Sequence, residues 1–375
     1  MEYKRLGDYI RPVDVRNRDL KVNLSQGICN AKYFQNPKQV ADNPESHKIV
    51  RTGQFAYNRA TTRNGEKISI ALREGPDCTV SSAYQVFEIV DNNRLDPKYL
   101  MMWFKRPEFD RYAIYYSHGS AHEFFEYESM CDVMLPVPDI ARQREIVAEY
   151  ETLSNRIRLN EQMIAKLEAT AQALYRKMFV DGIDKENLPE GWRMGTVGEF
   201  CKEMKSGGTP NRAYKEYWYH KDYPWLKSGE IHNNIVFSVD EYISQAGLDN
   251  SSAKVIPKGA VTMAMYGATA AQVAYLDCDT TTNQACCNMI CYSKEDAAYL
   301  FFHLLANQGD IKKLANGGAQ ENLSQELIAQ QFIILFNDKD KKAMFVPILD
   351  NLIVKYRDNS KLTELQSLLL AKIGK

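Results

Sequence analysis

The stretch that decides the fold is residues 146–178, IVAEYETLSNRIRLNEQMIAKLEATAQALYRKM. From Ile146 to Met178 the seam of this stretch advances by alternating steps of four and three residues, and charged side chains flank it. This is the a/d pattern of a coiled coil, and it predicts a helix over residues 141–180. At roughly 1.5 Å per residue, the part from Ala141 to Phe179 is about 58 Å long, which suits a spacer.

A second seam of the same kind ends the chain. It runs from Phe345 to Leu369 with one slip after Asn359, and it predicts a helix over residues 339–375. Asn160 and Asn359 occupy corresponding positions in the two seams. A single polar residue in such a seam usually fixes the register of a helix pair at some cost in stability. We therefore expect the two helices to pair, with Asn160 and Asn359 as register residues.

The two helices close two copies of one unit. The chain matches itself at an offset of about 200 residues, and such internal similarity decides an architecture before any local motif does. Residues 6–9 match 197–200, residues 50–55 match 256–261, residues 99–104 match 299–304, and residues 119–124 match 317–322. Because these matches keep the same order in both halves, we interpret the chain as a duplication.

Each copy is predicted to be an α+β domain. Short runs rich in β-branched and aromatic residues, such as 84–90 and 260–263, accompany single helices near 97–106 and 295–307. The regular βαβ alternation of a doubly wound sheet is missing. The predicted boundaries are a first domain at 1–140, a helix at 141–180, a linker at 181–191, a second domain at 192–338 and a helix at 339–375.

Composition and charge narrow the class of protein. The 375 residues suffice for two domains, and 45% of apolar residues is ordinary for a globular chain. The net charge is −1, but residues 1–75 carry 14 Lys and Arg against 8 Asp and Glu, a weak footprint of nucleic-acid binding. No apolar run reaches the length of a membrane span, no signal-peptide pattern opens the chain, and the eight cysteines form no Cys-x-x-Cys pair. We therefore expect a cytoplasmic chain with reduced thiols and no membrane association.

Motifs of the common enzyme classes are absent from the sequence. There is no Gly-x-x-x-x-Gly-Lys phosphate loop, no Gly-x-Gly-x-x-Gly after a strand, no Gly-x-Ser-x-Gly, no His-Glu-x-x-His and no Asp/Asn-Pro-Pro-aromatic tetrapeptide of amino-methyltransferases. One enzyme alternative stays open, because Asp77, Asp96 and Lys98 follow the spacing of nucleases that hold a metal with two carboxylates. Asp96 before Pro97 is also a good helix start, with the aspartate as N-cap. Polar side chains on apolar runs are assigned to the core rather than to a metal site: His303, Cys286, Cys287 and Cys291.

Five short segments carry a resemblance to a known family. They are Leu188–Trp192, Ser206–Pro210, Pro224–Ile231, Thr282–Ala285 and Gly318–Ser324. With these segments and the repeat, the sequence resembles the DNA specificity (S) subunits of type I restriction-modification systems. The resemblance covers the whole chain, but the first half departs from it at Ser81–Ala83 and Ser120–Phe125.

The resemblance implies a division of labour between subunits. Each domain would be a target recognition domain that reads one half of an asymmetric, two-part site in double-stranded DNA, and the antiparallel helix pair would set the gap between the halves. Two methylase (M) subunits would carry S-adenosylmethionine and methylate an adenine in each half. Restriction (R) subunits would add translocation and cleavage that depend on ATP and Mg²⁺. The chain itself would be non-catalytic and would bind neither cofactor nor metal.

Candidate DNA contacts lie at basic turns and loops. Arginines in turns suit phosphate contacts and bidentate reading of guanine, and small residues let a backbone approach a phosphate or base. In the first domain the candidates are Lys48, Arg51, Tyr57, Arg59, Thr61, Thr62 and Arg63. In the second domain they are Lys205, Ser206, Gly207, Gly208, Thr209, Asn211, Arg212, Lys227, Tyr266 and Thr269. The alternative for these positions is an ordinary solvated surface of strands and turns.

Three other functions compete with this prediction. In the same class, the chain could be the specificity subunit of a two-subunit type II system whose partner both cuts and methylates. In a different class, it could be the nuclease built on Asp77, Asp96 and Lys98. Its near-neutral charge is also consistent with a coiled-coil scaffold that does not bind DNA. The sequence alone reveals neither the half-sites nor the gap length.

Overall fold

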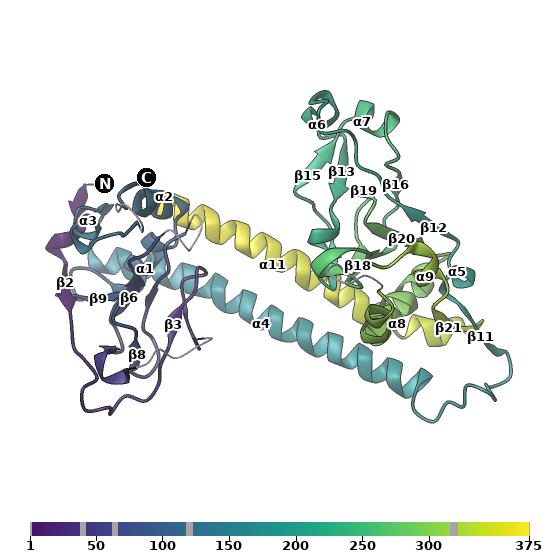
Figure 1. The fold of residues 1–375 in the computed structure, drawn as a ribbon, viewed down its shortest axis with the longest axis horizontal. Helices are drawn as coiled ribbons and strands as arrows, with labels where there is room; N and C mark the ends of the chain where they lie inside the picture. Colours follow the sequence, from purple (N-terminus) through teal and green to yellow (C-terminus); the bar gives the residue numbers. More distant parts are fainter. Residues whose placement is uncertain (1, 38–42, 62–66, 118–122, 316–321, 375) are drawn as a thin grey trace. The chain divides into compact units, whose positions relative to one another are not determined.

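The computed structural model describes residues 2–37, 43–61, 67–117, 123–315 and 322–374 and confirms the α+β class (Figure 1). The chain forms two compact units. The first unit comprises residues 1–157 and 361–375, and the second unit comprises residues 158–360. Two long helices, α4 (Ile140–Phe179) and α11 (Val346–Ile373), contribute to both units.

Helices α4 and α11 contact each other within each unit. In the first unit Gln366 Nε2 donates to Ser154 Oγ at 2.7 Å. In the second unit Asn160 Nδ2 donates to Asn359 Oδ1 at 2.9 Å, and Tyr356 Oη donates to Glu168 Oε1 at 3.4 Å. Within the second unit the residue number on α11 thus falls as the number on α4 rises, which is the antiparallel order. The Asn160–Asn359 hydrogen bond joins the two predicted register residues, and their role in setting the register stays a prediction.

The last helix begins later than the sequence predicts. A short helix, α10 (Lys339–Ala343), is separated by a turn from α11, instead of one helix over 339–375. Pro347 explains the break, because a proline in a helix interior has no N–H to donate and its ring clashes with the carbonyl four residues earlier, that of Ala343. As the second residue of α11, Pro347 is well tolerated.

The first unit is built around an antiparallel sheet in the order β2-β9-β6-β7, and helices α1 and α2 follow it in the chain. Its core centres on Phe55, Phe87 and Phe104, whose rings contact one another. The sheet strands are β2 (Ile10–Val13), β6 (Phe55–Asn58), β7 (Ile70–Leu72) and β9 (Tyr84–Ile89). Strand pairs are β1 (Tyr3–Arg5) with β10 (Met134–Pro136), β3 (Gly27–Ile28) with β4 (Phe34–Gln35), and β5 (Lys48–Val50) with β8 (Cys78–Val80). The short helices are η1 (Leu6–Asp8), η2 (Pro44–Ser46), α1 (Pro97–Phe104), α2 (Pro107–Tyr115) and α3 (Tyr127–Cys131).

The second unit contains two larger sheets and one strand pair. The five-stranded sheet has the order β12 (Glu203–Ser206), β20 (Cys286–Ile290), β17 (Val261–Ala264), β18 (Val273–Leu276) and β14 (Asn234–Val236). The four-stranded sheet has the order β15 (Glu241–Ile243), β13 (Tyr223–Leu226), β19 (Thr280–Thr282) and β16 (Val255–Ile256), and β11 (Trp192–Thr196) pairs with β21 (Phe332–Phe336). The helices besides α4, α10 and α11 are α5 (Val197–Phe200), α6 (Glu216–Tyr219), η3 (Ser228–Glu230), α7 (Gln245–Asp249), η4 (Gly267–Thr269), α8 (Lys294–Lys313) and α9 (Gln325–Ala329).

Corresponding residues of the two units make the same hydrogen bonds, as a duplication predicts. Tyr99 Oη donates to the Pro136 carbonyl in the first unit, and Tyr299 Oη donates to the Ile334 carbonyl in the second, both at 3.0 Å. Matching turns also share a left-handed glycine, Gly53 with φ +89° and Gly259 with φ +92°. Each glycine donates its N–H to a later strand, to the Arg73 carbonyl at 2.8 Å and to the Leu276 carbonyl at 2.7 Å. The two units therefore share one hydrogen-bond framework.

The units differ at the helix that follows the large sheet. The second unit has the single helix α8, whereas the first unit has α1 and α2, and α2 starts at Pro107. Within the described ranges, none of the helices combines the length and the apolar character that crossing a bilayer requires.

Candidate DNA interface

Segments that carry the family resemblance meet in the second unit. Gly208 N donates to the Thr282 carbonyl at 2.8 Å, and Asn283 N donates to the Leu226 carbonyl at 3.0 Å. Next to these bonds, the Thr209 hydroxyl contacts the Gln284 side-chain amide. The Gly-Gly loop, the Asn-Gln-Ala segment and the end of β13 therefore pack against one another.

The segment before α9 packs against the same group of segments. Met265 N donates to the Ala285 carbonyl, and Leu323 N donates to the Met265 carbonyl, each at 2.8 Å. Ser206 Oγ lies 2.7 Å from Gln325 Oε1 and donates to it. In the first unit, Phe125 N donates to the Arg59 carbonyl at 2.9 Å, which matches the Leu323 bond. Although the first half differs in sequence from the family pattern before Phe125, Phe125 makes the same backbone hydrogen bond as Leu323.

Two predicted DNA contacts of the second unit share one carboxylate. Arg212 lies 2.5 Å and Lys227 2.9 Å from the carboxylate of Glu241. The hydrogen bond from Arg212, followed by that from Lys227, lowers the pKa of Glu241 and keeps it charged. The Arg212 guanidinium also lies 3.7 Å from the Trp218 ring centroid, while 54% of the side chain stays exposed. A guanidinium held in this way presents its remaining N–H groups in a fixed direction, as reading a phosphate or a guanine requires.

The other polar candidates of the second unit each have local contacts or are partly exposed. Thr269 Oγ1 donates to the Ser228 carbonyl at 3.0 Å, directly beside Lys227, and Tyr266 is 42% exposed. Lys205 forms an ion pair with Glu203 at 2.8 Å. Asn211 Oδ1 accepts a hydrogen bond from Ala213 N at 2.9 Å and so stabilises the turn before α6.

The glycines of the loop have a different role from the one predicted. Gly207 and Gly208 are buried, and a Cβ at Gly207 would overlap the carbonyl oxygens of Thr282 and Asn283. A Cβ at Gly208 would overlap the backbone of Ser252 and Ala253. The missing side chains therefore permit close packing inside the domain, and the structure corrects the expectation that they make room for DNA.

Three candidates of the first unit are buried side chains. Tyr57 is fully buried in the core against Phe87, and burial raises the pKa of its hydroxyl. Lys48 is 8% exposed with Nζ 3.9 Å from the Asp14 carboxylate, and burial lowers the pKa of its ammonium group. Thr61 is 3% exposed and donates from Oγ1 to the Glu123 carbonyl. The structure thus places these three side chains in the domain interior instead of at a DNA-facing surface.

Arg51 and Arg59 remain at the surface of the first unit. Arg51 is exposed, and Arg59 forms an ion pair with Glu126 at 3.0 Å beneath the ring of Phe124, 5.6 Å away. The remaining candidates of this unit, Thr62 and Arg63, lie outside the described residues.

The nuclease residues have ordinary structural roles. Asp96 Oδ1 accepts hydrogen bonds from Lys98 N at 2.8 Å and Tyr99 N at 3.2 Å, so it is the N-cap of α1. Lys98 forms ion pairs with Glu151 and Glu74, and Asp77 accepts from Thr52 N at 3.2 Å. In the part of the chain that the structure describes, no three His, Cys, Asp or Glu side chains are grouped as metal ligands.

The assignment of His303 to the core agrees with the structure. Its Nδ1 lies 2.7 Å from Tyr175 Oη, and burial lowers the pKa of the ring to about 4. Cys286 and Cys287 are fully buried, and Cys291 is partly buried.

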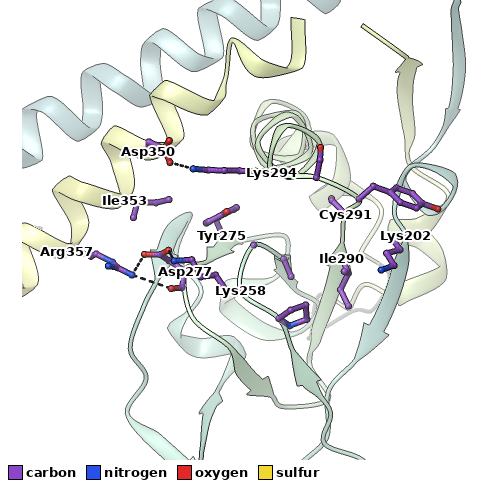
Figure 2. A pocket seen from close by; sticks show the side chains of 15 residues that line it. Lys202, Lys258, Tyr275, Asp277, Ile290, Cys291, Lys294, Asp350, Ile353 and Arg357 are labelled. Carbon is purple, nitrogen blue, oxygen red and sulfur yellow. Dashed lines mark hydrogen bonds and ion pairs between the residues drawn. The ribbon is translucent and has the colours of Figure 1, made fainter. Parts of the chain in front are cut away.

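A charged cavity that the sequence analysis did not predict lies between the large sheet of the second unit and α11 (Figure 2). Its volume is about 610 Å³. Figure 2 shows Lys258 and Arg357 converging on Asp277, which is buried, at 2.8 Å and 2.5 Å. A second pair, Lys294 with Asp350 at 2.5 Å, bridges α8 and α11. These ion pairs attach the large sheet and α8 to α11. In the sequence only the internal repeat could have indicated them, because Lys98 forms ion pairs with Glu74 and Glu151 at the corresponding place of the first unit.

Comparisons with known proteins agree with this framework. Residues 189–365 match the family model of the type I restriction modification DNA specificity domain. The chain is 22% identical over 428 residues to the type I restriction enzyme HindI specificity subunit of Haemophilus influenzae, covering 92% of this chain and 91% of that protein. It is 23% identical over 284 residues to the type I restriction enzyme EcoR124I/EcoR124II specificity subunit of Escherichia coli, covering 72% of this chain and 66% of that protein. The fold is similar to the crystal structure of the S subunit of a type I restriction-modification system from M. genitalium, with a TM-score of 0.63, 13% identity and coverage of 100% of this chain and 96% of that one. Residues 189–365 are thus similar to type I restriction modification DNA specificity domains, and the chain as a whole is similar to type I restriction enzyme specificity subunits.

Proposed function

We propose that each unit reads one half of an asymmetric, two-part DNA site. One observation carries the proposal: the two units share a hydrogen-bond framework but differ in the side chains that the framework presents. Arg51 and Arg59 of the first unit correspond to Pro257 and Met265 of the second, where Arg212 and Lys227 supply the exposed cations instead. Equal frameworks with unequal surface chemistry favour two different half-sites, because base edges are distinguished by the donors and acceptors that meet them.

In this proposal, α4 and α11 set the number of unread base pairs between the half-sites. Reading two half-sites from one face of B-DNA requires their separation to match the helical repeat of about 34–36 Å. The antiparallel seam between α4 and α11, with its Asn160–Asn359 bond, supports a spacer of fixed length. Adding or removing a heptad from both helices should therefore change the gap and leave both half-sites unchanged.

The chain would work as the non-catalytic part of a larger cytoplasmic complex. Two methylase subunits would supply S-adenosylmethionine chemistry on adenine, and restriction subunits would supply ATP- and Mg²⁺-dependent cleavage. The net charge of −1 supports this division, since binding DNA strongly through this chain alone would need more cations.

The test is to co-express the chain with the methylase encoded beside it in a host without adenine methylation, and to map modified adenines by long-read sequencing. A two-part motif with one fixed gap is expected. Arg212→Ala should lower methylation by roughly 5- to 150-fold, because a lost base or phosphate contact costs about 1–3 kcal/mol. Arg193→Ala is the matched control, since Arg193 is an exposed arginine of the same unit in an ion pair with Glu199.

Two outcomes would contradict the proposal. A stable complex that methylates no motif would point to a scaffold, and equal losses from Arg212→Ala and Arg193→Ala would deny Arg212 a reading role. Cleavage by the methylase partner itself would assign the chain to a two-subunit type II system and leave the two-part reading intact.

A further inference from the structure

The first unit contains a cavity that is rich in basic side chains. Among the described residues, this cavity of about 790 Å³ is lined by four cationic side chains and one carboxylate, that of Asp110. The cations are Lys32, Lys67, Lys105 and Arg111. They come from a turn before β4, from the segment before β7, from the end of α1 and from α2, so the chain brings them together from distant parts of its sequence.

The carboxylate of Asp110 is already bound to groups of the chain itself. Asp110 Oδ1 lies 2.7 Å from Lys32 Nζ, with the two side chains 9% and 5% exposed, and it also accepts from Ile68 N at 3.2 Å. Among the described residues, Arg111 pairs at 3.6 Å with Glu108, but Lys67 and Lys105 form no ion pair with a carboxylate. The Lys105 ammonium lies over the Tyr150 ring, 4.9 Å from its centroid. Among the described residues that line the cavity, four cations therefore face one carboxylate, while Glu74 and Glu151 outside this lining also act on Lys105.

The lysines also influence one another. Burial is the main cause that lowers the pKa of Lys32, and the nearby charges of Lys67 and Lys105 lower it further. An anion placed between these groups would relieve this repulsion. The cavity is thus suited to a negatively charged ligand.

Its position favours a phosphate of DNA as that ligand. In the sequence, Lys67 lies four residues after Arg63, a predicted DNA contact outside the described residues, and Ile68 N donates to Asp110. At the rim, Tyr115 is 77% exposed, and its hydroxyl can donate to a phosphate as tyrosines do in protein–DNA interfaces.

The second unit holds a neutral bridge in the corresponding place. Asn233 has a left-handed φ of +56°, as Lys32 has +66°, and it exchanges hydrogen bonds with Gln308 at 3.1 Å and 2.8 Å. Gln308 also donates to the Ala271 carbonyl, so it fixes the loop after η4 as Asp110 fixes Ile68. The same bridge is therefore charged in one unit and uncharged in the other.

We propose that the basic cavity of the first unit, around Lys67 and Lys105, binds a DNA backbone phosphate beside the half-site that this unit reads. This inference rests on the proposed DNA-reading function. It adds that the anchoring to DNA is unequal, with a phosphate subsite in the first unit that the bridge of Asn233 and Gln308 does not provide in the second.

The test uses the complex of this chain with its methylase and two fluorescent duplexes, one with the mapped motif and one scrambled. Affinities are measured by anisotropy over a series of salt concentrations, for wild type, Lys67→Gln, Lys105→Gln and the double variant. Each lost phosphate contact should lower the salt slope by about 0.9 and weaken binding about five- to tenfold at 0.1 M salt. Both duplexes should be affected equally, and the methylation motif should not change.

The control is Lys4→Gln, which removes a lysine of the same unit that pairs with Glu2 and has 42% of its side chain exposed. Because Lys67 is exposed, Lys67→Gln stays informative even where Lys105→Gln fails to assemble. Unchanged slopes and affinities in Lys67→Gln would overturn the phosphate subsite while the mapped motif still stands. The phosphate subsite would also be overturned if the lysine variants lose the methylase subunit while the complexes that remain bind DNA as tightly as wild type. That result would assign the cavity to an acidic segment of the methylase. Absence of any motif in wild type would instead reject the underlying function.

Discussion

Asn160 on α4 donates a hydrogen bond of 2.9 Å to Asn359 on α11. Asn160 is 4% exposed, so this bond lies inside an otherwise apolar seam. A shift of one helix along the other would break this bond and leave the buried amide of Asn160 without it, at about 1–3 kcal/mol for an unsatisfied buried group. We therefore expect the pair to disfavour other registers more than it stabilises the observed one.

Replacing one asparagine should cost more than replacing both. Asn160→Leu removes the hydrogen bond that Asn359 Oδ1 accepts and should lower the free energy of unfolding by about 1–2 kcal/mol. Asn160→Leu with Asn359→Leu should recover that loss, because leucine is favoured in such a seam, while the register becomes less defined. Chemical unfolding of the single and double variants checks the stabilities, and methylation mapping checks whether the gap broadens. Additive losses in the double variant would contradict this role.

Gly208 should not tolerate even a methyl group. Gly208→Ala forces a Cβ into the backbone of Ser252 and Ala253, and overpacking of this kind costs about 1–3 kcal/mol. Gly229→Ala is the matched control, since a Cβ there meets nothing within 4 Å and should change stability by less than about 1 kcal/mol. Melting temperatures and methylation of the mapped motif are the measurements. Equal behaviour of the two variants would contradict the packing role.

His303 should make the second unit sensitive to mild acid. The folded state holds the ring neutral with a pKa of about 4, whereas an unfolded histidine has a pKa of about 6.5. Between these values the unfolded state binds more protons, so stability is complete above about pH 6.5 and falls as the pH falls toward 4. At pH 5 the loss from this group is about 2 kcal/mol.

The comparison that isolates this effect is His303→Gln, which cannot titrate. The difference in unfolding free energy between pH 7 and pH 5, measured with urea, should be smaller in the variant than in wild type. The variant can be less stable at both pH values, because it alters the contact with Tyr175. An identical pH dependence in both proteins would show that His303 is already protonated in the folded state near pH 5.

Arg357 should matter more than Lys294, although both attach α11 to the second unit. Arg357→Ala leaves the buried Asp277 with Lys258 alone. The cost should be about 1–2 kcal/mol, below the 3–5 kcal/mol of a fully buried pair, because 47% of the Arg357 side chain is exposed. Lys294→Gln breaks a pair whose side chains are 45% and 48% exposed, and should cost less than about 1 kcal/mol. The reverse order in thermal unfolding would contradict the fastening role of Asp277.

The sequence predicted most where a pattern repeats over many residues. The seam from Ile146 to Met178 predicted α4 to within one residue at its start, because an unbroken period of 3.5 leaves few alternatives to a long helix. The second seam predicted a helix over 339–375, and the helix starts later because Pro347 acts on the backbone rather than on the apolar pattern.

By itself, then, the sequence determined that the chain is a duplicated α+β unit with paired helices, since periodicity and internal similarity survive in one dimension. The tertiary structure decided which candidate side chains face solvent. Tyr57 and Lys48 lie in a basic, aromatic stretch like Arg59, yet only packing against Phe87 and Asp14 buries them. It also decided the groupings of Arg212 with Glu241 and of Lys67 with Lys105, because these depend on contacts between residues far apart in the chain. Charge and side-chain type are local properties of the sequence, whereas burial and proximity are properties of the folded chain.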